Sequence, residues 1–586
     1  MSDTVCAECS EPAQLKCSAC KLVAYCGKDH QKKHWKVHKT LCRPFEIAED
    51  PEIGKCLVAT RDIRPGDIIL AELPVVYGPR PHMVEEGPVP CPGCCRLIIG
   101  EQSARCEGCD FPICNPECPG LNDMDKHGHE CKILGLRDVR AINGLHEFYR
   151  QDALLALRCL LLQSRHPKKF AQLMEMESHM GFRGEDTEVY KCTHGRSCED
   201  VDSRVVSYLN DNFFAPLNIL EGKSGKKVLQ DISRETIHKI CGIIDVNALE
   251  INQDAEVSAL YPTAYLLEHS CVPNSMHIFE NEPSGYKITV KAAVPIQSGE
   301  HITTMYTHCL WGTQARREHL KETKYFSCKC KRCCDPTELG SYLSALRCIG
   351  TDEEPCGGTQ LPIDPLDDKT EWACDKCDVK LTNAEVCFLV NGIGEEVDNV
   401  QLANPTVREL DSLLNKMLTF LHPNHYHVYA VKHSLIQLYG YQQGYLPNQI
   451  TDDCLVKKAV MCRELLDITR KVDPGNARLP LYLGVILHEL YLANWVLIKR
   501  KWDLGIKTKV KSVVTMLQEC QRSLGQAKET LKNEVNTPAG EKLLNLVATS
   551  AKEFGKFVER NKIDLSAKEK VKENGVENGD VNGNGN

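Results

Sequence analysis

The sequence lacks the hydrophobic segments that direct a chain into or across a membrane. Its first residues, MSDTVCAECSEPAQ, contain no apolar secretion signal, and we find no uninterrupted apolar run long enough to span a bilayer. Net positive charge is also missing, since 80 acidic residues outnumber 71 basic ones. The run from 21 to 39 is locally basic and is interpreted as a solvated face. These absences argue against secretion, membrane insertion and direct nucleic-acid binding, and they predict a nuclear and cytoplasmic protein.

Cysteine, in contrast, is abundant, with 33 residues. In a reducing compartment so many thiols are expected to be metal ligands rather than disulfides. In two blocks the cysteines and histidines form close pairs, each able to hold one tetrahedral zinc from a tight turn. The pairs are Cys6 and Cys9, Cys17 and Cys20, Cys26 and His30, His38 and Cys42, and then Cys91 and Cys94, Cys106 and Cys109, Cys114 and Cys118, His127 and Cys131. This repeat predicts two modules with eight ligands and two zinc ions each.

The 586-residue length and the 42% of hydrophobic residues predict several domains. Between 56 and 76 the sequence CLVATRDIRPGDIILAELPVV has short β-rich runs around a turn, which predicts two or three strands. Strand patterns return near 286–290 and 302–305, after apolar residues at helical spacing between 153 and 161. We therefore expect an α+β core assembled from sequence-distant pieces.

The C-terminal third has a helical pattern throughout. From about 404 to 557 apolar residues recur at helical spacing, which predicts successive antiparallel helices. Core packing accounts for these leucines, and no repeat of fixed period accompanies them. Past Lys568 the tail KVKENGVENGDVNGNGN has only scattered valines as apolar residues and is predicted to be disordered.

Three further motifs point to a known family. They are LLEHSCVPNS at 266–275, SGEHITTMY ending at Tyr306, and the closely spaced Cys328, Cys330 and Cys333. Together with the zinc pairs they resemble the SET and MYND domain (SMYD) protein-lysine methyltransferases, in an arrangement similar to the arthropod SmydA branch. The resemblance covers roughly residues 1 to 560 and is far more specific than any one zinc pair.

The resemblance implies an α+β multidomain fold. Its parts are a SET β-fold with a pseudoknot, zinc-binding MYND fingers, a helical SET insert and an all-α, tetratricopeptide-like C-terminal domain. The expected divisions are an N-terminal MYND finger at 1–45, SET strands at 46–90, a second MYND-type finger at 91–131, the helical insert at 132–250, the SET C-terminal core at 251–310, the post-SET segment at 311–340, a zinc knuckle at 341–390, the helical domain at 400–560 and the tail at 565–586.

The resemblance also implies a site that transfers a methyl group from S-adenosylmethionine to a protein lysine. Tyr306 would orient the lysine amine and the departing methyl group. The expected cofactor-binding residues are Lys55, Asn247, Leu266, Glu268, His269, Asn274 and Phe326. Histone and non-histone lysines are both open as substrates, and MYND fingers in general resemble docking modules for short proline-containing peptides.

Two more zinc sites are expected. The resemblance and the C-x-C-x-x-C spacing imply one post-SET zinc, held by Cys271, Cys328, Cys330 and Cys333. A further set flanks a Pro- and Asp-rich stretch with too few apolar residues for a core, which indicates a zinc knuckle. Its ligands are Cys348, Cys356, Cys374 and Cys377.

Three positions depart from the family pattern. Residues 54–56 read Gly-Lys-Cys where the family has a Gly-x-Gly turn close to the cofactor. The family's Asn-His-Ser-Cys begins with Glu268, an acceptor-only carboxylate in place of an amide that also donates. Lys324 stands where the family's second active-site tyrosine is expected, and a loop shift by one residue would put the catalytic candidate Tyr325 there. Two functions therefore stay open: a lysine methyltransferase, or a weak or inactive SET scaffold that acts as a MYND-finger adaptor or transcriptional regulator.

Overall fold

The structure is a computed structural model of the chain. It describes residues 5–17, 23–38, 42–80, 89–98, 104–135, 144–183, 233–252, 255–351, 356–505 and 511–565. Cys20, much of the expected helical insert and the predicted disordered tail lie outside the described residues. The predictions made for them therefore stay predictions.

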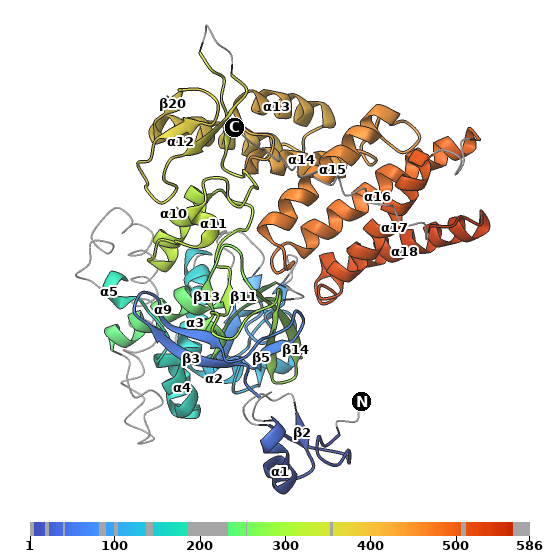
Figure 1. Cartoon of the computed structure of the whole chain (residues 1–586). Helices are drawn as coiled ribbons and strands as arrows, with labels where there is room; N and C mark the ends of the chain where they lie inside the picture. Colours follow the sequence, from blue (N-terminus) through green and yellow to red (C-terminus); the bar gives the residue numbers. More distant parts are fainter. Residues whose placement is uncertain are drawn as a thin grey trace, which may run out of the picture.

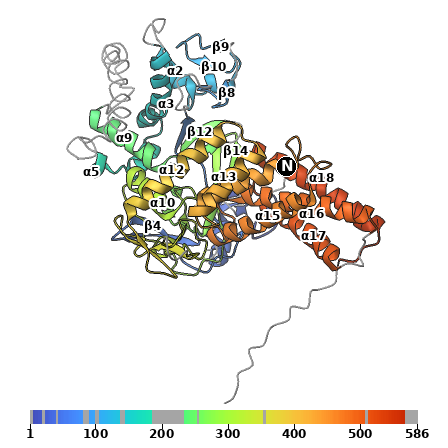
Figure 2. The ribbon, with the colours of Figure 1, turned by 90° about the horizontal axis from the view of Figure 1, so that it is seen from above.

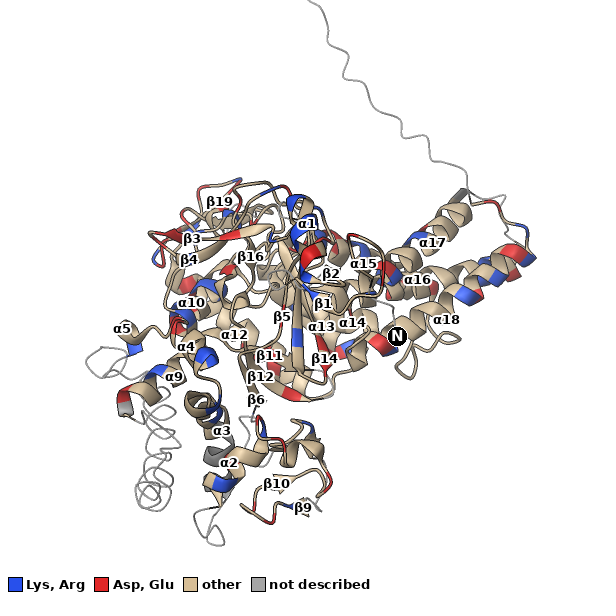
Figure 3. Cartoon of the chain, turned by 90° about the horizontal axis from the view of Figure 1, so that it is seen from below, with Lys and Arg blue, Asp and Glu red and all other residues tan. Residues whose placement is uncertain are grey.

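The N-terminal finger lies apart from the body of the molecule (Figure 1). It contains β1 (Leu15–Lys16), β2 (Ala24–Tyr25) and α1 (Lys28–His38). Basic residues gather on α1 (Figure 3), where Lys28, Lys32, Lys33 and Lys36 are all exposed. The solvated basic face expected from the sequence is therefore confirmed for this helix.

Three small antiparallel sheets form the β-core. Their strand orders are β3 (Phe45–Asp50) with β4 (Gly54–Ala59); β14 (Ser275–Glu282), β15 (Gly285–Ala292) and β5 (Ile68–Glu72); and β11 (Leu249–Asn252), β12 (Glu256–Leu260) and β6 (Val76–Pro79). Alternate residues of β15, from Tyr286 to Ala292, are buried because successive side chains point to opposite faces of a strand. Strands near 45–79 thus pair with strands near 249–292, which confirms a core built from sequence-distant pieces.

A crossing of two segments fastens the C-terminal part of this core. After the short helix η3 (Ala264–Leu266), β13 (Glu268–His269) pairs in parallel with β16 (Thr303–Thr304). The Asn274 side chain donates to the main-chain oxygen of His301 at 2.8 Å and accepts from the N–H of Thr303 at 2.8 Å. The segment around residue 270 is thereby fixed beside residues 301–304, where the pseudoknot was expected.

The second zinc block lies between β6 and the helical insert. Its elements are β7 (Val89–Pro90), β8 (Leu97–Ile98), β9 (Ala104–Arg105), β10 (Pro112–Ile113), η1 (Pro119–Leu121) and α2 (His127–Leu134), followed by α3 (Gly144–Arg165), α4 (Pro167–Met174), α5 (Met180–Arg183) and α9 (Arg234–Asn247). Figure 2 shows α2 and α3 beside this block. The predicted apolar face of α3 is fully buried at Leu154, Leu157 and Leu160, in one cluster with Ile237 and Ile240 of α9.

Beyond β16 the chain forms the post-SET segment, the knuckle and the helical domain. The elements are α10 (Thr313–Lys324), α11 (Lys331–Cys334), a sheet of β17 (Leu346–Arg347), β18 (Thr359–Pro362), β19 (Trp372–Cys374) and β20 (Lys380–Leu381), and then α12 (Asn383–Leu402), α13 (Val407–Phe420), α14 (Tyr426–Leu438), α15 (Asp452–Val472), α16 (Pro480–Asp503), α17 (Lys511–Leu531) and α18 (Pro538–Arg560). Capping boxes of Thr382 with Glu385, and of Thr406 with Glu409, start α12 and α13. The predicted helical C-terminal domain is confirmed (Figure 1).

Helix α16 is the central helix of this domain. By length and composition alone it is apolar enough to cross a membrane, with a window of mean hydropathy 1.5. His488 and Glu489 interrupt the apolar run of this helix, although its mean hydropathy stays high. In the structure 72% of that window is buried, and a core helix meets the same criterion.

Candidate functional site

The first finger brings its ligand pairs together in an interleaved order. Ligand atoms of the first and third pairs, from Cys6, Cys9, Cys26 and His30, lie within 4.8 Å of one another. The Sγ atoms of Cys17 and Cys42, from the second and fourth pairs, lie 3.5 Å apart, and His38 is buried. Both arrangements suit tetrahedral zinc, although Cys20 lies outside the described residues.

The second block repeats this crossing in full. Its first and third pairs, Cys91 with Cys94 and Cys114 with Cys118, form one cluster, and its second and fourth pairs, Cys106 with Cys109 and His127 with Cys131, form another. In each cluster all ligand atoms lie within 4.8 Å of one another. The spacing of the pairs was readable in the sequence, but their crossing is a property of the fold.

A buried carboxylate orients the histidine of this second block. His127 Nδ1 lies 3.3 Å from Oε1 of Glu130, and its Nε2 lies 3.4 Å from Sγ of Cys109. The guanidinium of Arg158 on α3 donates twice to Glu130, at 2.8 Å each. Burial opposes the ionisation of Glu130, yet the charge of Arg158 holds its pKa below the usual value. The pair of Glu130 and Arg158 therefore ties the finger to the helical insert and fixes the imidazole for metal binding.

The post-SET cysteines also converge. Cys271 meets Cys328, Cys330 and Cys333, with all four sulfurs within 4.8 Å of one another. Behind them Arg316 Nε donates to Cys271 Sγ at 3.2 Å, and its Nη1 donates to Glu338 Oε2 at 2.8 Å. Arg332 Nε donates to the same carboxylate oxygen at 3.0 Å. These buried cations offset the negative charge that thiolate ligands carry.

The knuckle cysteines gather on the sheet of β17 to β20. Cys348, Cys356, Cys374 and Cys377 place their sulfurs within 4.8 Å of one another. The loose spacing of the first pair is spanned by the β17–β18 turn, since the main-chain N–H of Cys348 donates to the oxygen of Gly358. The described residues thus contain at least five complete four-ligand clusters that suit zinc.

Tyr306 lies at the end of the crossing segment. Its hydroxyl donates to the main-chain oxygen of Leu267, and its own N–H donates to His269 Nδ1 at 2.9 Å. Burial, and then the charge of Glu268, raise the pKa of Tyr306, so its hydroxyl stays protonated at neutral pH. An oxygen that already donates its proton presents lone pairs to a further donor, such as an amine N–H.

Other expected cofactor residues surround this tyrosine. The ring of Phe326 lies 6.0 Å from the ring of His269, and Leu266 is buried. The Asn274 side chain forms its two hydrogen bonds with the crossing segment described above. The structure thus brings the rings of His269, Phe326 and Tyr306 together. Leu266 is buried nearby in the sequence, and Asn274 holds the crossing segment in place.

Lys55 and Asn247 are placed differently. Lys55 is exposed at the start of β4. Asn247 is buried at the end of α9, and its Nδ2 donates to the main-chain oxygens of Glu177 at 2.7 Å and Ile243 at 2.8 Å. Both N–H donors of Asn247 are therefore already used within the protein.

Glu268 has an internal partner. Both of its carboxylate oxygens lie within hydrogen-bond distance of His301 Nδ1, at 2.9 and 3.0 Å. The side chain of Glu268 is 20% exposed and that of His301 is 37% exposed. The residue that replaces the family's asparagine thus has a hydrogen-bonding partner that was not predicted from the sequence.

Lys324 lies against the catalytic candidate, and Tyr325 does not. The Nζ of Lys324 is 5.9 Å from the ring centroid of Tyr306 and donates to the main-chain oxygens of Asp245 and Val246, at 3.0 and 2.7 Å. Burial lowers the pKa of Lys324. No shift of the loop by one residue is seen.

Tyr325 is turned to the helical insert instead. It ends α10 in the left-handed conformation, with φ +61°, which non-glycine residues seldom adopt. Its hydroxyl accepts from Arg183 at 3.2 Å, and its ring stacks on Phe182 with centroids 5.6 Å apart. The left-handed turn that ends α10 after Lys324 directs the Tyr325 side chain toward the helical insert.

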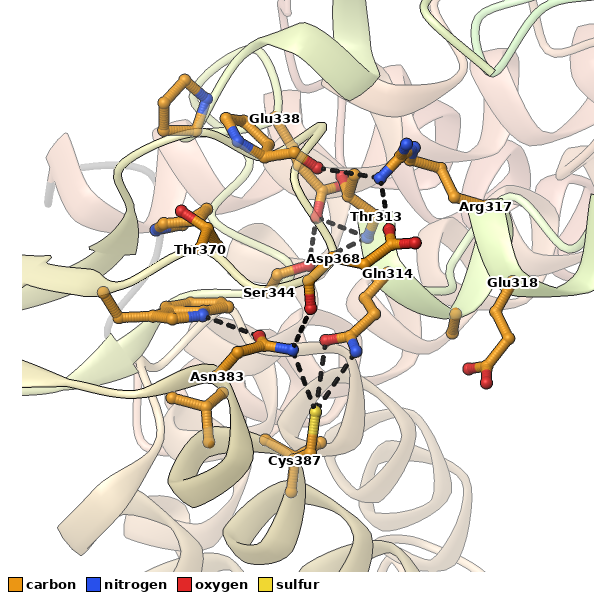
Figure 4. A pocket seen from close by; sticks show the side chains of 18 of the residues that line it. Thr313, Gln314, Arg317, Glu318, Glu338, Ser344, Asp368, Thr370, Asn383 and Cys387 are labelled. Atoms are coloured by element: carbon orange, nitrogen blue, oxygen red, sulfur yellow. Dashed lines mark hydrogen bonds and ion pairs between the residues drawn. The ribbon is translucent and has the colours of Figure 1, made fainter. Parts of the chain in front are cut away.

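A pocket of about 210 Å³ lies between α10, the knuckle and α12, apart from Tyr306 (Figure 4). Arg317 pairs there with Asp368 at 3.1 Å, and Gln314 and Asn383 both donate to Cys387 Sγ. Its polar groups thus contact one another and join three parts of the fold. None of the site residues predicted from the sequence lines it.

Sequence reasoning missed the residues that support the ligands. Glu130 follows His127 by three positions on a helix, so it had a local signal. Arg158, His301, Arg316 and Glu338 had none, because their partners are distant in the sequence.

Comparisons with known proteins agree with this geometry. The MYND finger family matches residues 6–42, and the SET domain family matches residues 54–307, a span that includes the second zinc block and the insert. SET domain-containing protein SmydA-8, isoform B, of Drosophila melanogaster is 30% identical over 379 residues, which cover 62% of this chain and 75% of that protein.

More distant relatives have methyltransferase names. Histone-lysine N-methyltransferase ASHR1 of Arabidopsis thaliana is 22% identical over 405 residues, covering 66% of this chain and 75% of that protein. N-lysine methyltransferase SMYD2 of Rattus norvegicus is 23% identical over 278 residues, covering 43% of this chain and 56% of that protein.

Proposed function

Because the chain belongs to the SET and MYND domain family, in its SmydA-like branch, we propose that it transfers a methyl group from S-adenosylmethionine to a lysine of another protein. The observation that carries the proposal is the placement of Tyr306. Its buried hydroxyl donates to Leu267, and its main chain is held by His269 in the crossing segment. Relatives with methyltransferase names make transfer to a protein lysine the best-supported reaction.

The residues around Tyr306 suit a cationic cofactor. S-adenosylmethionine, when bound, supplies the methyl group on a positively charged sulfur. Glu268 offers a carboxylate near this site, and the main-chain oxygens of Asp245 and Val246 already bind one cation, the Nζ of Lys324. Phe326 and Leu266 add apolar surface. The donor set therefore fits the charge of the cofactor.

The protein's own part in the reaction is to orient the amine. The Tyr306 hydroxyl donates its hydrogen bond to the main-chain oxygen of Leu267, so its oxygen is free to accept a hydrogen bond from the N–H of an incoming lysine. An amine held in this way directs its lone pair along one line, which lowers the entropic part of the barrier. The amine must arrive deprotonated, and an apolar, water-poor channel favours that form.

A second function, a MYND-finger adaptor, is favoured by two observations. Lys324 occupies space beside Tyr306 where a substrate amine would have to lie. The first finger carries exposed apolar residues on α1, with Trp35 42% and Val37 60% exposed. Short proline-containing peptides are the partners we propose for that surface.

Calorimetric titration with S-adenosylmethionine distinguishes the two functions. We would compare the zinc-replete native chain with Glu268→Asn, Lys324→Tyr and, as a matched control, Glu46→Asn on the exposed face of β3. Binding by the native chain supports the enzyme, and Tyr306→Phe should then abolish transfer without loss of binding. Binding only after restoration supports the adaptor. No heat of binding in any variant at about 1 mM would rule out the methyltransferase.

A further inference from the structure

A cleft of about 350 Å³ begins at Tyr306 and separates the SET core from the helical domain. One wall comes from residues 306–311, after β16, and from His319 on α10. The other wall comes from the loop between α15 and α16 and from Tyr482 in the first turn of α16. A protein segment that delivers a lysine to Tyr306 would lie along this cleft.

Aromatic and imidazole rings line much of the cleft. The ring centroids of His308 and Trp311 lie 5.8 Å apart, those of Trp311 and His319 lie 5.4 Å apart, and those of His308 and Tyr482 lie 6.5 Å apart. Trp311 is 37% exposed. Such a wall provides contact area for an extended peptide at low entropic cost.

Arg478 gives the cleft a positive charge. No Asp, Glu or Lys is among the residues that line the cleft. The Arg478 guanidinium makes no hydrogen bond or ion pair with the residues that the structure describes. Asp473, whose charge acts on Arg478, uses its carboxylate oxygens on the main-chain N–H groups of Ala477, Arg478 and Leu479 at 2.8 to 2.9 Å. These bonds fix the loop and leave the guanidinium available.

We propose that this cleft selects protein segments that carry an acidic side chain within a few residues of the lysine directed at Tyr306. An unpaired guanidinium is a strong and geometrically specific partner for a carboxylate. The aromatic wall holds the remainder of the segment. The identity of the target lysine rests on the proposed function, whereas the charge preference is a property of binding alone.

The test is fluorescence anisotropy with short labelled peptides and the zinc-replete full chain. Each peptide has a central lysine, and Glu, Gln or Arg is placed in turn at each position within three residues of it. We expect Glu at one or two of these positions to bind about tenfold more tightly than Gln, and Arg to bind more weakly than Gln. Raising the salt concentration should weaken this preference.

Charge reversal provides the matched control. Arg478→Glu should invert the order, so that Arg peptides bind more tightly than Glu peptides, while Arg522→Glu, an exposed change on α17 away from the cleft, should keep the native order. If Arg478→Glu does not fold, as judged by thermal unfolding, Arg478→Gln should abolish the preference without inverting it.

Equal affinities for Glu, Gln and Arg peptides would overturn the proposal. So would a preference that persists in both Arg478 variants, or no binding of any peptide at about 1 mM. Because methyl transfer is not measured, the result is independent of the cofactor titration. A chain that prefers acidic peptides but binds no S-adenosylmethionine would retain this inference and lose the proposed enzyme.

Discussion

Replacing Glu338 by Gln should loosen the post-SET zinc site, although Glu338 is not a zinc ligand. Its carboxylate lies between Arg316 and Arg332, and all three residues are at most 1% exposed. Arg316 also donates to the sulfur atoms of Cys271 and Cys333. With Gln at this position, two buried guanidinium groups lose their counter-charge, and the one that contacts the zinc ligands loses its anchor.

The cost follows from the pKa of Glu338. Burial opposes ionisation, but Arg316 and Arg332 lower this pKa from 4.5 to about 2. The difference corresponds to about 3 kcal/mol at about 1.36 kcal/mol per pKa unit, and removing one partner from a buried ion pair usually costs about 3–5 kcal/mol. In the native chain this stabilisation is complete above pH 4.5 and is lost as the pH falls toward about 2. The Gln variant lacks it at every pH.

Hydrogen exchange measured by mass spectrometry is the appropriate assay, because a multidomain chain has no single unfolding equilibrium. Protection of the segment 313–334 should fall about a hundredfold in Glu338→Gln at neutral pH, while the α15–α18 helices keep theirs. The matched control is Glu318→Gln, an exposed change on α10. Native-like exchange of 313–334 together with native-like zinc release would refute the reasoning.

Three other changes test separate parts of the molecule. Glu130→Gln removes the counter-charge of a buried arginine and leaves a neutral amide beside His127, so a chromogenic chelator should draw zinc from the second block about ten- to a hundredfold faster; an unchanged rate would contradict the role assigned to this carboxylate. Tyr325→Phe removes a hydroxyl whose partner is Arg183, so the affinity for S-adenosylmethionine should change less than about twofold; a tenfold loss would mean that Tyr325 contributes to the site after all. Leu490→Ala on α16 deletes a side chain that is 2% exposed and should lower the free energy of opening of the α15–α18 helices by about 2–5 kcal/mol, as measured by hydrogen exchange; a cost below about 1 kcal/mol would mean that α16 is not the core of this domain.

The zinc ligands were the most predictable part of this chain. A pair such as Cys91 and Cys94 is close in space because it is close in sequence, so spacing alone places its two sulfurs together. Which pairs share one metal depends on how the block crosses itself, and no local pattern encodes that. The helices were predictable for a similar reason, since apolar residues recur at helical spacing along α3 and α16, although both helices are buried on more than the one face that this spacing marks.

The supporting contacts were not predictable, because each joins residues far apart in the chain. Arg158 meets Glu130 across the boundary between the second finger and the insert, and His301 meets Glu268 across the crossing of β13 and β16. From the sequence alone, a single charged residue is predicted to lie on the surface. Only its burial beside an opposite charge shows that it is structural.

The departures from the family pattern are accommodated as a set. Glu268 has His301, Lys324 has the oxygens of Asp245 and Val246, and Lys55 is exposed to water. Restoring the family's residue at Glu268 or Lys324 therefore also breaks the hydrogen bonds that the present residue makes. Lys324→Tyr leaves two main-chain oxygens without their donor, at about 1–3 kcal/mol for a buried group. If the site binds its cofactor in the present form, the native chain should bind more tightly than either single restoration. The opposite order of affinities would mean that these contacts stabilise a closed scaffold.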